Sequence, residues 1–364
     1  MVKLRLSGMG TAVPPGVLKQ TDAAEASRLF CGANGRRARA LGMLYRRSGV
    51  ESRNTVVVRA EQGKLQERVP FYPAASGPED RGPTTGQRMA SYEAEAPPLA
   101  EMAARRALED ASTSVDSITH LVTVSCTGFF SPGLDVALID ALELPRTVHR
   151  THVGFMGCHG ALNGLRVAAS QAGDSQARIL LCAVELCSLH FAYGWDSEML
   201  VANTLFADGA AAVVGVPVLN GETSGWNVQA QGTFLMPDSV DAMSWRIGDH
   251  GFRMRLSAEV PELIRTNLSG WLGGWLRQQG LALEDVGSWA VHPGGPRILD
   301  AVEDAVALEN GSLDVSRDVL RGHGNMSSPT VLFVLERLRK ADAPLPCVVL
   351  AFGPGLVVEA LLVV

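Results

Sequence analysis

The sequence predicts an α/β fold built from two similar halves. Each half contains short apolar segments rich in Val, Ile and Leu, which are typical of buried strands. In each half a glycine turn opens into a helix-like stretch between the first two segments. Strands that alternate with helices indicate mainly parallel sheets covered by helices. The expected strands are residues 120–126, 177–186 and 210–218 in the first half, and 288–292, 346–353 and 356–364 in the second.

The composition limits the kind of protein. The chain has 364 residues, of which 46% are hydrophobic and 19% charged, with a net charge of −6. This mild acidity argues against nucleic acid as a partner, because phosphate-binding surfaces are basic. No signal peptide is recognisable, and no apolar run approaches the ~20 residues of a membrane-spanning helix. We therefore expect a cytoplasmic protein with no transmembrane segment.

The six cysteines show neither the paired spacing of a metal site nor a dense disulfide framework. Reduced thiols in a cytoplasmic protein are the expected state, and no metal is expected.

The remaining segments suggest how the chain is organised. Residues 71–88 are rich in Pro and Gly and are expected to form a surface loop, and residues 99–112 are expected to form a helix. The segment "LNGETSGW" (219–226) is the best candidate for the link between the halves. The domain prediction is therefore an N-terminal half at 1–220 and a C-terminal half at 221–364.

Cys158 lies between glycines in "FMGCHG", directly before the helix-like stretch "ALNGLRVAASQ". A helix N-terminus lowers the pKa of a thiol, because unpaired N–H groups and the helix dipole favour the anion. The turn glycines allow a substrate to approach closely. The alternative is a small structural cysteine. Cys182 and Cys187, in or just after a strand, fit that alternative well, whereas Cys158 fits it poorly.

Two further residues stand in comparable turns. His292 ends a strand in "WAVHPGGP", where sheets of this class expose functional groups, and it could take the proton of Cys158 to leave a thiolate–imidazolium pair. Asn325 stands in "GHGNMSSP", where Ser327 or Ser328 would cap the helix that follows, and its amide could donate to an oxyanion. Backbone-bonded turn residues are the alternative for both.

Five segments in the same order resemble one known family. They are "GFMGCHGALNGLRVA", "LFADGAAAVV", "WAVHPGGPRILDAVE", "GNMSSPTVLFVLE" and "AFGPGLVVEALLV". All are similar to segments of chalcone-synthase-like enzymes, the type III polyketide synthases of the thiolase superfamily. The resemblance implies a homodimeric, thiolase-like αβαβα fold of two pseudo-duplicated halves. It also implies an acyltransferase with no cofactor besides its CoA thioester substrates.

The resemblance also implies roles for the three turn residues. Cys158 corresponds to the nucleophile that carries the acyl group, and His292 and Asn325 to the pair that holds the thioester carbonyl of malonyl-CoA. Decarboxylation would give an enolate that extends the acyl chain by two carbons, and repeated extension would precede cyclisation. A thiol nucleophile suits this chemistry, since it and the CoA leaving group are nearly matched in basicity.

The cavity predicted from the resemblance differs from that of the plant enzymes. Phe206 corresponds to a gatekeeper aromatic, Met254 stands where plant enzymes have a second phenylalanine, and Trp245 where they have a small glycine. The changes make an aromatic starter doubtful and favour long acyl-CoA starters that give alkylpyrones or alkylresorcinols. The other predicted cavity residues are Cys126, Cys187, His190, Ser327, Phe352, Gly353, Pro354 and Gly355.

Two surface features complete the prediction. The stretch "NGRRARALGMLYRRSG" carries basic residues where the family contacts CoA phosphates, and Arg46 and Arg47 are the expected contacts; a solvated helix face is the alternative. Ser131 and Pro132 match the loop that reaches across the family's dimer. An acyl carrier protein is an alternative donor of the starter.

Three other functions remain open from the sequence. A single-condensation enzyme similar to β-ketoacyl-carrier-protein synthase III also uses Cys, His and Asn, although the Ala-Phe-Gly-Pro-Gly loop and "HPGGP" favour the iterative branch. A thioester hydrolase would share the order Cys, His, Asn. An inactive binding protein is the third alternative.

Overall fold

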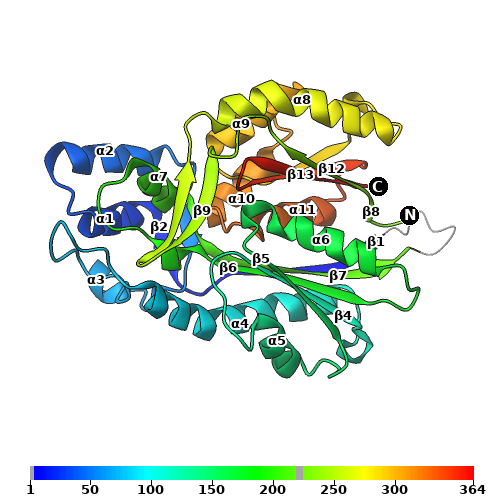
Figure 1. The fold of residues 1–364 in the computed structure, drawn as a ribbon, viewed down its shortest axis with the longest axis horizontal. Coiled ribbons are helices and arrows are strands. Elements are labelled where there is room, and N and C mark those ends of the chain that lie inside the picture. The colour runs from blue at the N-terminus through cyan, green and yellow to red at the C-terminus, as the bar shows by residue number, and fades with distance from the viewer. Residues whose placement is uncertain (1–3, 219–223) are drawn as a thin grey trace.

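A computed structural model describes residues 4–218 and 224–364. A continuous sheet of nine strands runs through the molecule in the order β11-β12-β13-β8-β1-β7-β6-β4-β5 (Figure 1). Its two halves meet where β1 pairs with β8 through only two residue pairs, Leu4 with Val228 and Arg5 with Asn227. The predicted α/β class is therefore confirmed, and the sheet is nearly divided at this narrow junction.

The strands of this sheet include all six that the sequence predicts. They are β1 (Leu4–Ala12), β4 (His120–Ser125), β5 (His149–Gly154), β6 (Ile179–Leu186), β7 (Asp208–Pro217), β8 (Asn227–Leu235), β11 (Ser288–Val291), β12 (Cys347–Gly353) and β13 (Val357–Val363). Two small sheets pair β2 (Val17–Lys19) with β3 (Ser52–Asn54) and β9 (Met243–Gly248) with β10 (Gly251–Leu256).

The prediction of mainly parallel sheets is wrong. Only three of the strand pairs in the large sheet are parallel, namely β4 with β5, β4 with β6, and β11 with β12. The chain turns from β12 directly into β13 through Pro354, Gly355 and Leu356. So short a connection can join only antiparallel strands.

The helices lie on both faces of the sheet and between its halves. They are α1 (Gln20–Phe30), α2 (Gly35–Arg46), α3 (Leu65–Arg68), α4 (Thr85–Asp110), α5 (Leu134–Leu142), α6 (Gly160–Gln171), α7 (Ser197–Leu205), α8 (Val260–Gln278), α9 (Pro296–Val306), α10 (Asp314–His323) and α11 (Thr330–Lys340). None in the described ranges is long and apolar enough to cross a membrane.

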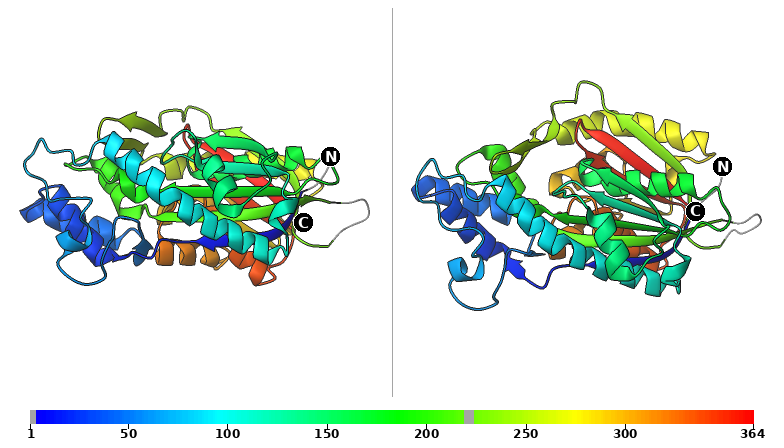
Figure 2. Two further views of the ribbon diagram at one scale, coloured as in Figure 1. Left: turned by 90° about the horizontal axis from the view of Figure 1, so that it is seen from below. Right: turned by 60° about the horizontal axis from the view of Figure 1, so that its bottom comes forward.

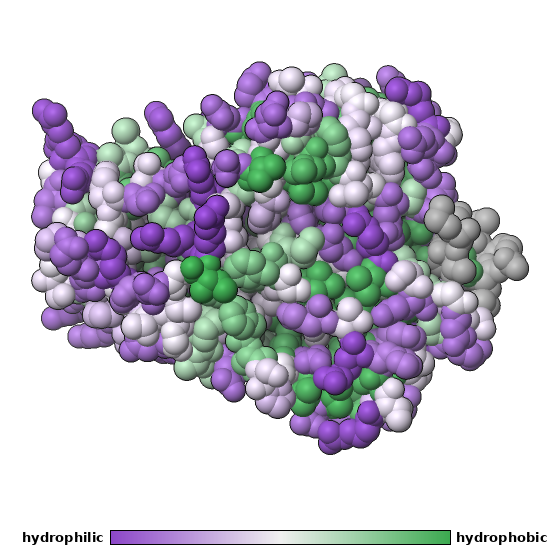
Figure 3. Space-filling model, viewed as in Figure 1, coloured by the Kyte–Doolittle hydropathy of each residue, from purple (hydrophilic) through white to green (hydrophobic). Residues whose placement is uncertain are grey.

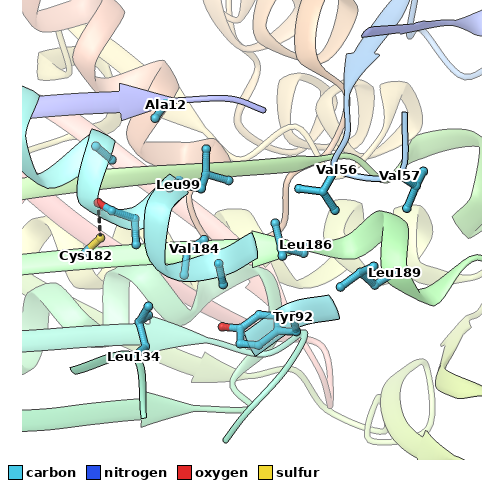
Figure 4. Packing of buried hydrophobic residues seen from close by; sticks show 14 of the residues in the cluster. Ala12, Val56, Val57, Tyr92, Leu99, Leu134, Cys182, Val184, Leu186 and Leu189 are labelled. Carbon is cyan, nitrogen blue, oxygen red and sulfur yellow. Dashed lines mark hydrogen bonds between the residues drawn. The ribbon is translucent and has the colours of Figure 1, made fainter. Parts of the chain in front are cut away.

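Three clusters of buried apolar residues separate five layers, in agreement with the predicted αβαβα arrangement. The first cluster lies between α4 and the N-terminal half of the sheet. Figure 4 shows Tyr92 and Leu99 of α4 facing Val184 and Leu186 of β6 there. Figure 2 shows α4 along that face of the sheet. The second cluster holds α6 and α11 between the two halves, and the third packs α8 and α9 on the C-terminal half.

Helix α4 begins well before the predicted helix at 99–112. Thr84 caps it by accepting a hydrogen bond from the Gln87 amide, so the Pro- and Gly-rich stretch ends earlier than expected. Pro97 and Pro98 lie inside the helix, and the sequence interpretation placed the start of the helix after them.

The predicted link at 219–226 lies largely outside the described residues, since the structure describes only 224–226 of it. The division into halves at 220 and 221 therefore stays a prediction.

Candidate active site

A pocket that encloses about 540 Å³, open solvent included, lies beyond the ends of β4 and β6, where Cys126 and Cys187 follow these strands. Cys158 is part of its wall. The thiol stands in a short 3₁₀ turn, Gly157–His159, which leads directly into α6. Gly157 has a φ of +76°, and a Cβ added there would come within 2.4 Å of the Pro354 ring. Glycine is therefore required at this position by both the backbone angle and the space.

The turn before α11 brings Asn325 and Ser327 to the same thiol. Both side chains hydrogen-bond to Cys158 and lower its pKa. Ser327 also lies 3.4 Å from the Cys126 sulfur and adopts a φ of +57°, which is uncommon for a residue with a side chain. The two glycine-flanked turns that the sequence singles out therefore meet at the nucleophile position.

The Asn325 side chain is held by its own loop. Its Oδ1 accepts from the Ser327 amide at 2.8 Å, so its Nδ2 faces Cys158 as the donor, and its bond to the Gly294 carbonyl is long at 3.5 Å. The backbone of Asn325 bridges to the end of α7, since Ala207 donates to its carbonyl and its amide donates to Leu205. An amide donor with only a weak partner is suited to an oxyanion.

His292 follows β11 and is 1% exposed. Its amide donates to Leu350 of β12, which fixes the backbone, while both ring nitrogens lack a hydrogen-bond partner among the described residues. Gly294 connects it to Asn325, because a Cβ built there would lie 3.9 Å from the ring Nε2 and its carbonyl faces Asn325. A buried imidazole without a partner is unusual and points to a transient one.

Burial favours the neutral forms of both the Cys158 thiol and the His292 ring, and so opposes an ion pair between them. Desolvation raises the pKa of Cys158 to about 11, against the hydrogen bonds from Ser327 and Asn325. Burial also lowers the pKa of His292 to about 3. Each group alone is therefore neutral at pH 7. The helix N-terminus does not by itself produce the lowered thiol pKa that the sequence suggests, and the thiolate–imidazolium pair stays a prediction.

Many of the predicted cavity residues line the pocket, and several do not. Phe352 packs in the third apolar cluster, Gly353 lies under the His159 ring, and Gly355 faces Leu235, so the structure does not bring these three into the wall of this pocket. Of the Ala-Phe-Gly-Pro-Gly loop, only Pro354 lines the pocket. Phe352 and Gly353 belong to strand β12 and pair with β13. The predicted residues in the wall are Cys126, Cys187, His190, Phe206, Trp245, Met254, Ser327 and Pro354.

Sequence reasoning missed other parts of the wall. On α7, Met199, Ala202 and Asn203 precede Phe206 with the spacing of one helix face, a signal that could have found them. Met243 alternates with Trp245 on β9, as residues on one face of a strand do. The β9–β10 hairpin itself was also missed, although the Gly-Asp-His-Gly sequence at 248–251 favours a turn.

Trp245 fills the pocket from the hairpin side. Its Nε1 donates to the Cys126 carbonyl at 2.7 Å, and its ring meets His190 edge to face. His190 in turn donates from Nε2 to the Thr127 carbonyl and accepts at Nδ1 from the Phe252 amide. Burial lowers the pKa of His190 to about 3, so this wall is aromatic and neutral.

Glu185 is the buried carboxylate that ties the end of β4 to the turn before α11. It accepts from the Cys126 amide and the Thr127 hydroxyl on one side, and from the Ser328 hydroxyl at 2.6 Å on the other. Burial raises its pKa, against these hydrogen bonds. The carboxylate is fully enclosed and does not line the pocket, so its contacts fix the site rather than the substrate.

The predicted surface features lie on exposed segments. Arg46 and Arg47 end α2, which packs against α7 of the pocket wall, and both are exposed. Ser131 and Pro132 are exposed in the loop before α5. No cluster of His, Cys, Asp or Glu suited to a metal ion occurs within residues 4–218 and 224–364.

A buried thiol shared by two related turns is the arrangement that the sequence predicts for a cysteine-dependent enzyme of thiolase-like architecture. The model of the chalcone and stilbene synthase N-terminal domain matches residues 3–217, and that of the C-terminal domain matches residues 227–364. The chain belongs to the chalcone and stilbene synthase family, and the family predicted from its motifs is confirmed.

Curated relatives support the same assignment over the whole chain. A 1,3,6,8-tetrahydroxynaphthalene synthase of Streptomyces peucetius is 35% identical over 98% of this chain and 92% of the relative. An alpha-pyrone synthesis polyketide synthase-like protein of Mycobacterium tuberculosis is 31% identical over 98% and 90%. The chain is therefore a type III polyketide synthase, an acyltransferase that condenses malonyl-CoA iteratively.

Solved structures show the same fold. The crystal structure of PKS-I from the brown alga Ectocarpus siliculosus has a TM-score of 0.92 and 31% identity, and the match covers 100% of this chain and 98% of that one. The C-terminal type III polyketide synthase domain of Steely1 from Dictyostelium has a TM-score of 0.87 and 26% identity, with 99% of both chains covered.

Proposed function

We propose that this synthase loads a long-chain acyl starter on Cys158 and extends it to an alkylpyrone or alkylresorcinol. The observation that carries the proposal is the convergence of two turns, one from each half, on a thiol in an apolar pocket. CoA thioesters are the substrates, and no further cofactor is proposed. The pyrone-forming mycobacterial relative supports this class of product, since it is similar over nearly the whole chain.

The first step transfers the acyl group. The Cys158 sulfur attacks the thioester carbonyl, a new C–S bond forms, and CoA leaves as its thiol with the proton that Cys158 gives up. Because burial holds the thiol protonated, a base must accept this proton as the substrate binds. His292 is the base proposed here, since its ring nitrogens are uncommitted among the described residues.

The second step makes the carbon nucleophile. The thioester oxygen of malonyl-CoA accepts hydrogen bonds from a neutral His292 N–H and from Asn325 Nδ2. Loss of CO₂ leaves the electron pair of the broken C–C bond on the enolate that these donors stabilise. The enolate attacks the acyl carbonyl, the C–S bond to Cys158 breaks, and the released thiolate takes up one proton from the solvent.

The wall of the pocket supports an alkyl starter. Met199 and Met254 belong both to this pocket and to a neighbouring surface pocket that also contains Ser244 and Arg246. Two flexible thioethers therefore separate the cavity from the surface, and their movement would let a chain extend beyond Trp245. Trp245 occupies the volume that an aromatic starter would need.

A product analysis tests this proposal. The purified protein is incubated with malonyl-CoA and a series of starters from C2 to C18 and aromatic acyl-CoAs, and the products are measured by mass spectrometry. Pyrones or resorcinols that lengthen with the starter are expected, with C10 or longer chains preferred over coumaroyl-CoA. A preference for aromatic starters contradicts the starter class, a single β-keto product indicates the one-step synthase, and free acids alone indicate a hydrolase.

A matched variant tests the role of Trp245. Removing the indole in Trp245→Gly opens the pocket and removes the hydrogen bond to Cys126. We expect coumaroyl-CoA to become a better starter relative to the C12 substrate. An unchanged preference would remove Trp245 from the account of specificity.

We also propose a homodimer, a CoA-binding role for Arg46 and Arg47, and a cytoplasmic location, with a carrier protein as an alternative donor of the starter. Phe129, Phe155 and Met156 support the dimer, because they are 54%, 37% and 38% exposed and the rings of Phe129 and Phe155 both contact Phe252. Figure 3 shows hydrophobic residues in separate patches on one face of the molecule. Large exposed apolar side chains around one loop are typical of an interface.

A further inference from the structure

A polar chain runs through the otherwise apolar central layer and ends beside the nucleophile. It consists of His159, Asn163 and Arg166 on one face of α6 and of Glu359 on β13. Their spacing of four and three residues places the α6 members above one another. Buried charged and polar groups are costly in such a layer, so their presence requires an explanation.

The hydrogen bonds fix the direction of every group in this chain. The Glu359 carboxylate, 3% exposed, accepts from Asn163 Nδ2 at 3.0 Å and from Thr233 Oγ1 at 3.0 Å, and it contacts the Arg166 guanidinium. A carboxylate in this position only accepts, so Asn163 turns its NH₂ group toward Glu359. Its Oδ1 therefore faces His159 Nδ1 at 2.7 Å, and that nitrogen must carry the proton.

The imidazole of His159 is confined next to the catalytic groups. It directly follows Cys158 and is 2% exposed, and its ring lies so close to Gly353 that an added Cβ would come within 2.3 Å of Cδ2. His292 is near enough that a charge on His159 lowers the pKa of His292. The tautomer and charge of His159 thus affect the group proposed to accept the thiol proton.

We propose that His159 is a positioning residue, held by Glu359 through Asn163 as a neutral ring with Nδ1 protonated, so that His292 can take the proton of Cys158. A cation at His159 would face any imidazolium formed at His292 and oppose that transfer. This inference rests on the proposed role of His292. His159 itself is neither in the pocket wall nor one of the three turn residues Cys158, His292 and Asn325.

The charged groups around His159 come from several elements. Cys158 lies in the turn before α6, Arg166 on α6, Glu359 on β13 and His292 after β11, while β12 contributes only Gly353. Burial is the largest cause that lowers the pKa of His159, Asn163 and Glu359 raise it, and Arg166 lowers it. At pH 7 the ring is therefore neutral, and its proton lies on Nδ1.

The first experiment observes the tautomer directly. The protein is labelled with ¹⁵N-histidine, and the His159 signals are assigned by their loss in His159→Phe, with His120→Phe as a control for assignment among the eight histidines. At pH 7 a protonated Nδ1 and an unprotonated Nε2 are expected. An Nε2-protonated tautomer, or a charged ring at pH 7, would overturn the proposal, whether or not the protein proves to be a polyketide synthase.

The second experiment separates positioning from structural support. Arg166→Gln removes a positive charge and Glu359→Gln a negative one, with little change in shape. Because charge on His159 opposes the transfer of the Cys158 proton to His292, the acid limb of the rate of Cys158 acylation by a C12 acyl-CoA should move to higher pH in Arg166→Gln and to lower pH in Glu359→Gln. Shifts in the same direction, or none, would contradict the inference.

The His159→Phe variant sets the size of the effect. We expect kcat to fall about tenfold or more while KM stays within about twofold, since the residue acts on the proton transfer and not on substrate binding. An unchanged kcat in a folded variant would overturn the role. Failure of the wild-type protein to decarboxylate malonyl-CoA would instead contradict the proposed function.

Discussion

The turns before α6 and α11 occupy corresponding places in the two halves and meet at Cys158, yet they differ in how their groups are held. In the second turn Asn325 is fixed by Ser327 and by a bridge to the end of α7. In the first turn the thiol is held only by side chains of the other turn, while the next residue, His159, begins a polar chain to Glu359. We therefore expect the groups of the first turn, Cys158 and His159, to change protonation, and the Asn325 side chain of the second turn to stay fixed.

The helices that follow show the same difference. The first eight or so residues of α11 are nearly all buried and mostly apolar, whereas α6 carries Asn163 and Arg166 on an inward face. A rigid donor suits an oxyanion that forms in a fixed place, and an adjustable proton suits a nucleophile that must be released and recovered. We therefore infer that the two halves divide the proposed chemistry between them.

The largest effect is expected from the rigid turn. Asn325→Leu removes the amide donor while it keeps a side chain of similar size, so malonyl-CoA decarboxylation should fall by about 10²–10³-fold. Acylation of Cys158 by a starter should change much less, because Asn325 is assigned to the enolate step. Release of CO₂ and the mass of the acylated protein measure the two steps, and an equal loss of both would show that the division between the turns is wrong.

A smaller but more diagnostic effect concerns the charge of the first turn. The thiolate is the form that reacts with iodoacetamide, so alkylation rises with pH through the pKa of Cys158. If His292 accepts the Cys158 proton, the alkylation rate of wild-type protein should have its inflection at a pH below the pKa of about 11 that burial gives the thiol. In His292→Gln the inflection should move up toward that value. The modified peptide identifies Cys158, and identical profiles would contradict a shared proton.

Loss of the Ser327–Cys158 contact between the turns should change the alkylation rate of Cys158 several-fold. The Ser327 hydroxyl lowers the pKa of Cys158, so Ser327→Ala should raise that pKa and slow alkylation at pH 8. Cys126→Ser serves as a matched control, because it changes the other neighbour of the same hydroxyl. Faster alkylation in Ser327→Ala would be inconsistent with the hydrogen bond described here.

The smallest effect is expected outside both turns. Replacing Arg46 and Arg47 by Gln should raise KM for the CoA thioester several-fold with little change in kcat, and the difference should shrink at high salt because exposed charges are screened. Steady-state kinetics at 50 and 500 mM salt would measure it. An unchanged KM would favour a solvated helix face without contact to CoA.

The sequence predicts the strands and the central turns well, because buried strands are apolar and the turns need glycine at positions such as Gly157. It predicts strand direction poorly, since the antiparallel β12–β13 pair depends on a loop of only three residues. Phe352 and Gly353 show a second limit, because membership of a motif does not tell which side of the sheet a residue faces.

Polar contacts between residues far apart in the chain could not be predicted from the sequence. The partners of His159 come from positions four and two hundred residues away along the chain, and no local pattern pairs Asn163 with Glu359. The pKa of Cys158 was likewise misjudged, because the helix N-terminus is visible in sequence while the extent of burial is not.

The most direct test of the central claim is the intact mass of the protein after incubation with a C12 acyl-CoA in the absence of malonyl-CoA. We expect an added mass of one acyl group on wild-type protein, mapped to Cys158 by peptide analysis and absent in Cys158→Ala. An acyl group on another residue, or one that persists in Cys158→Ala, would contradict the assignment of this thiol as the acyl carrier.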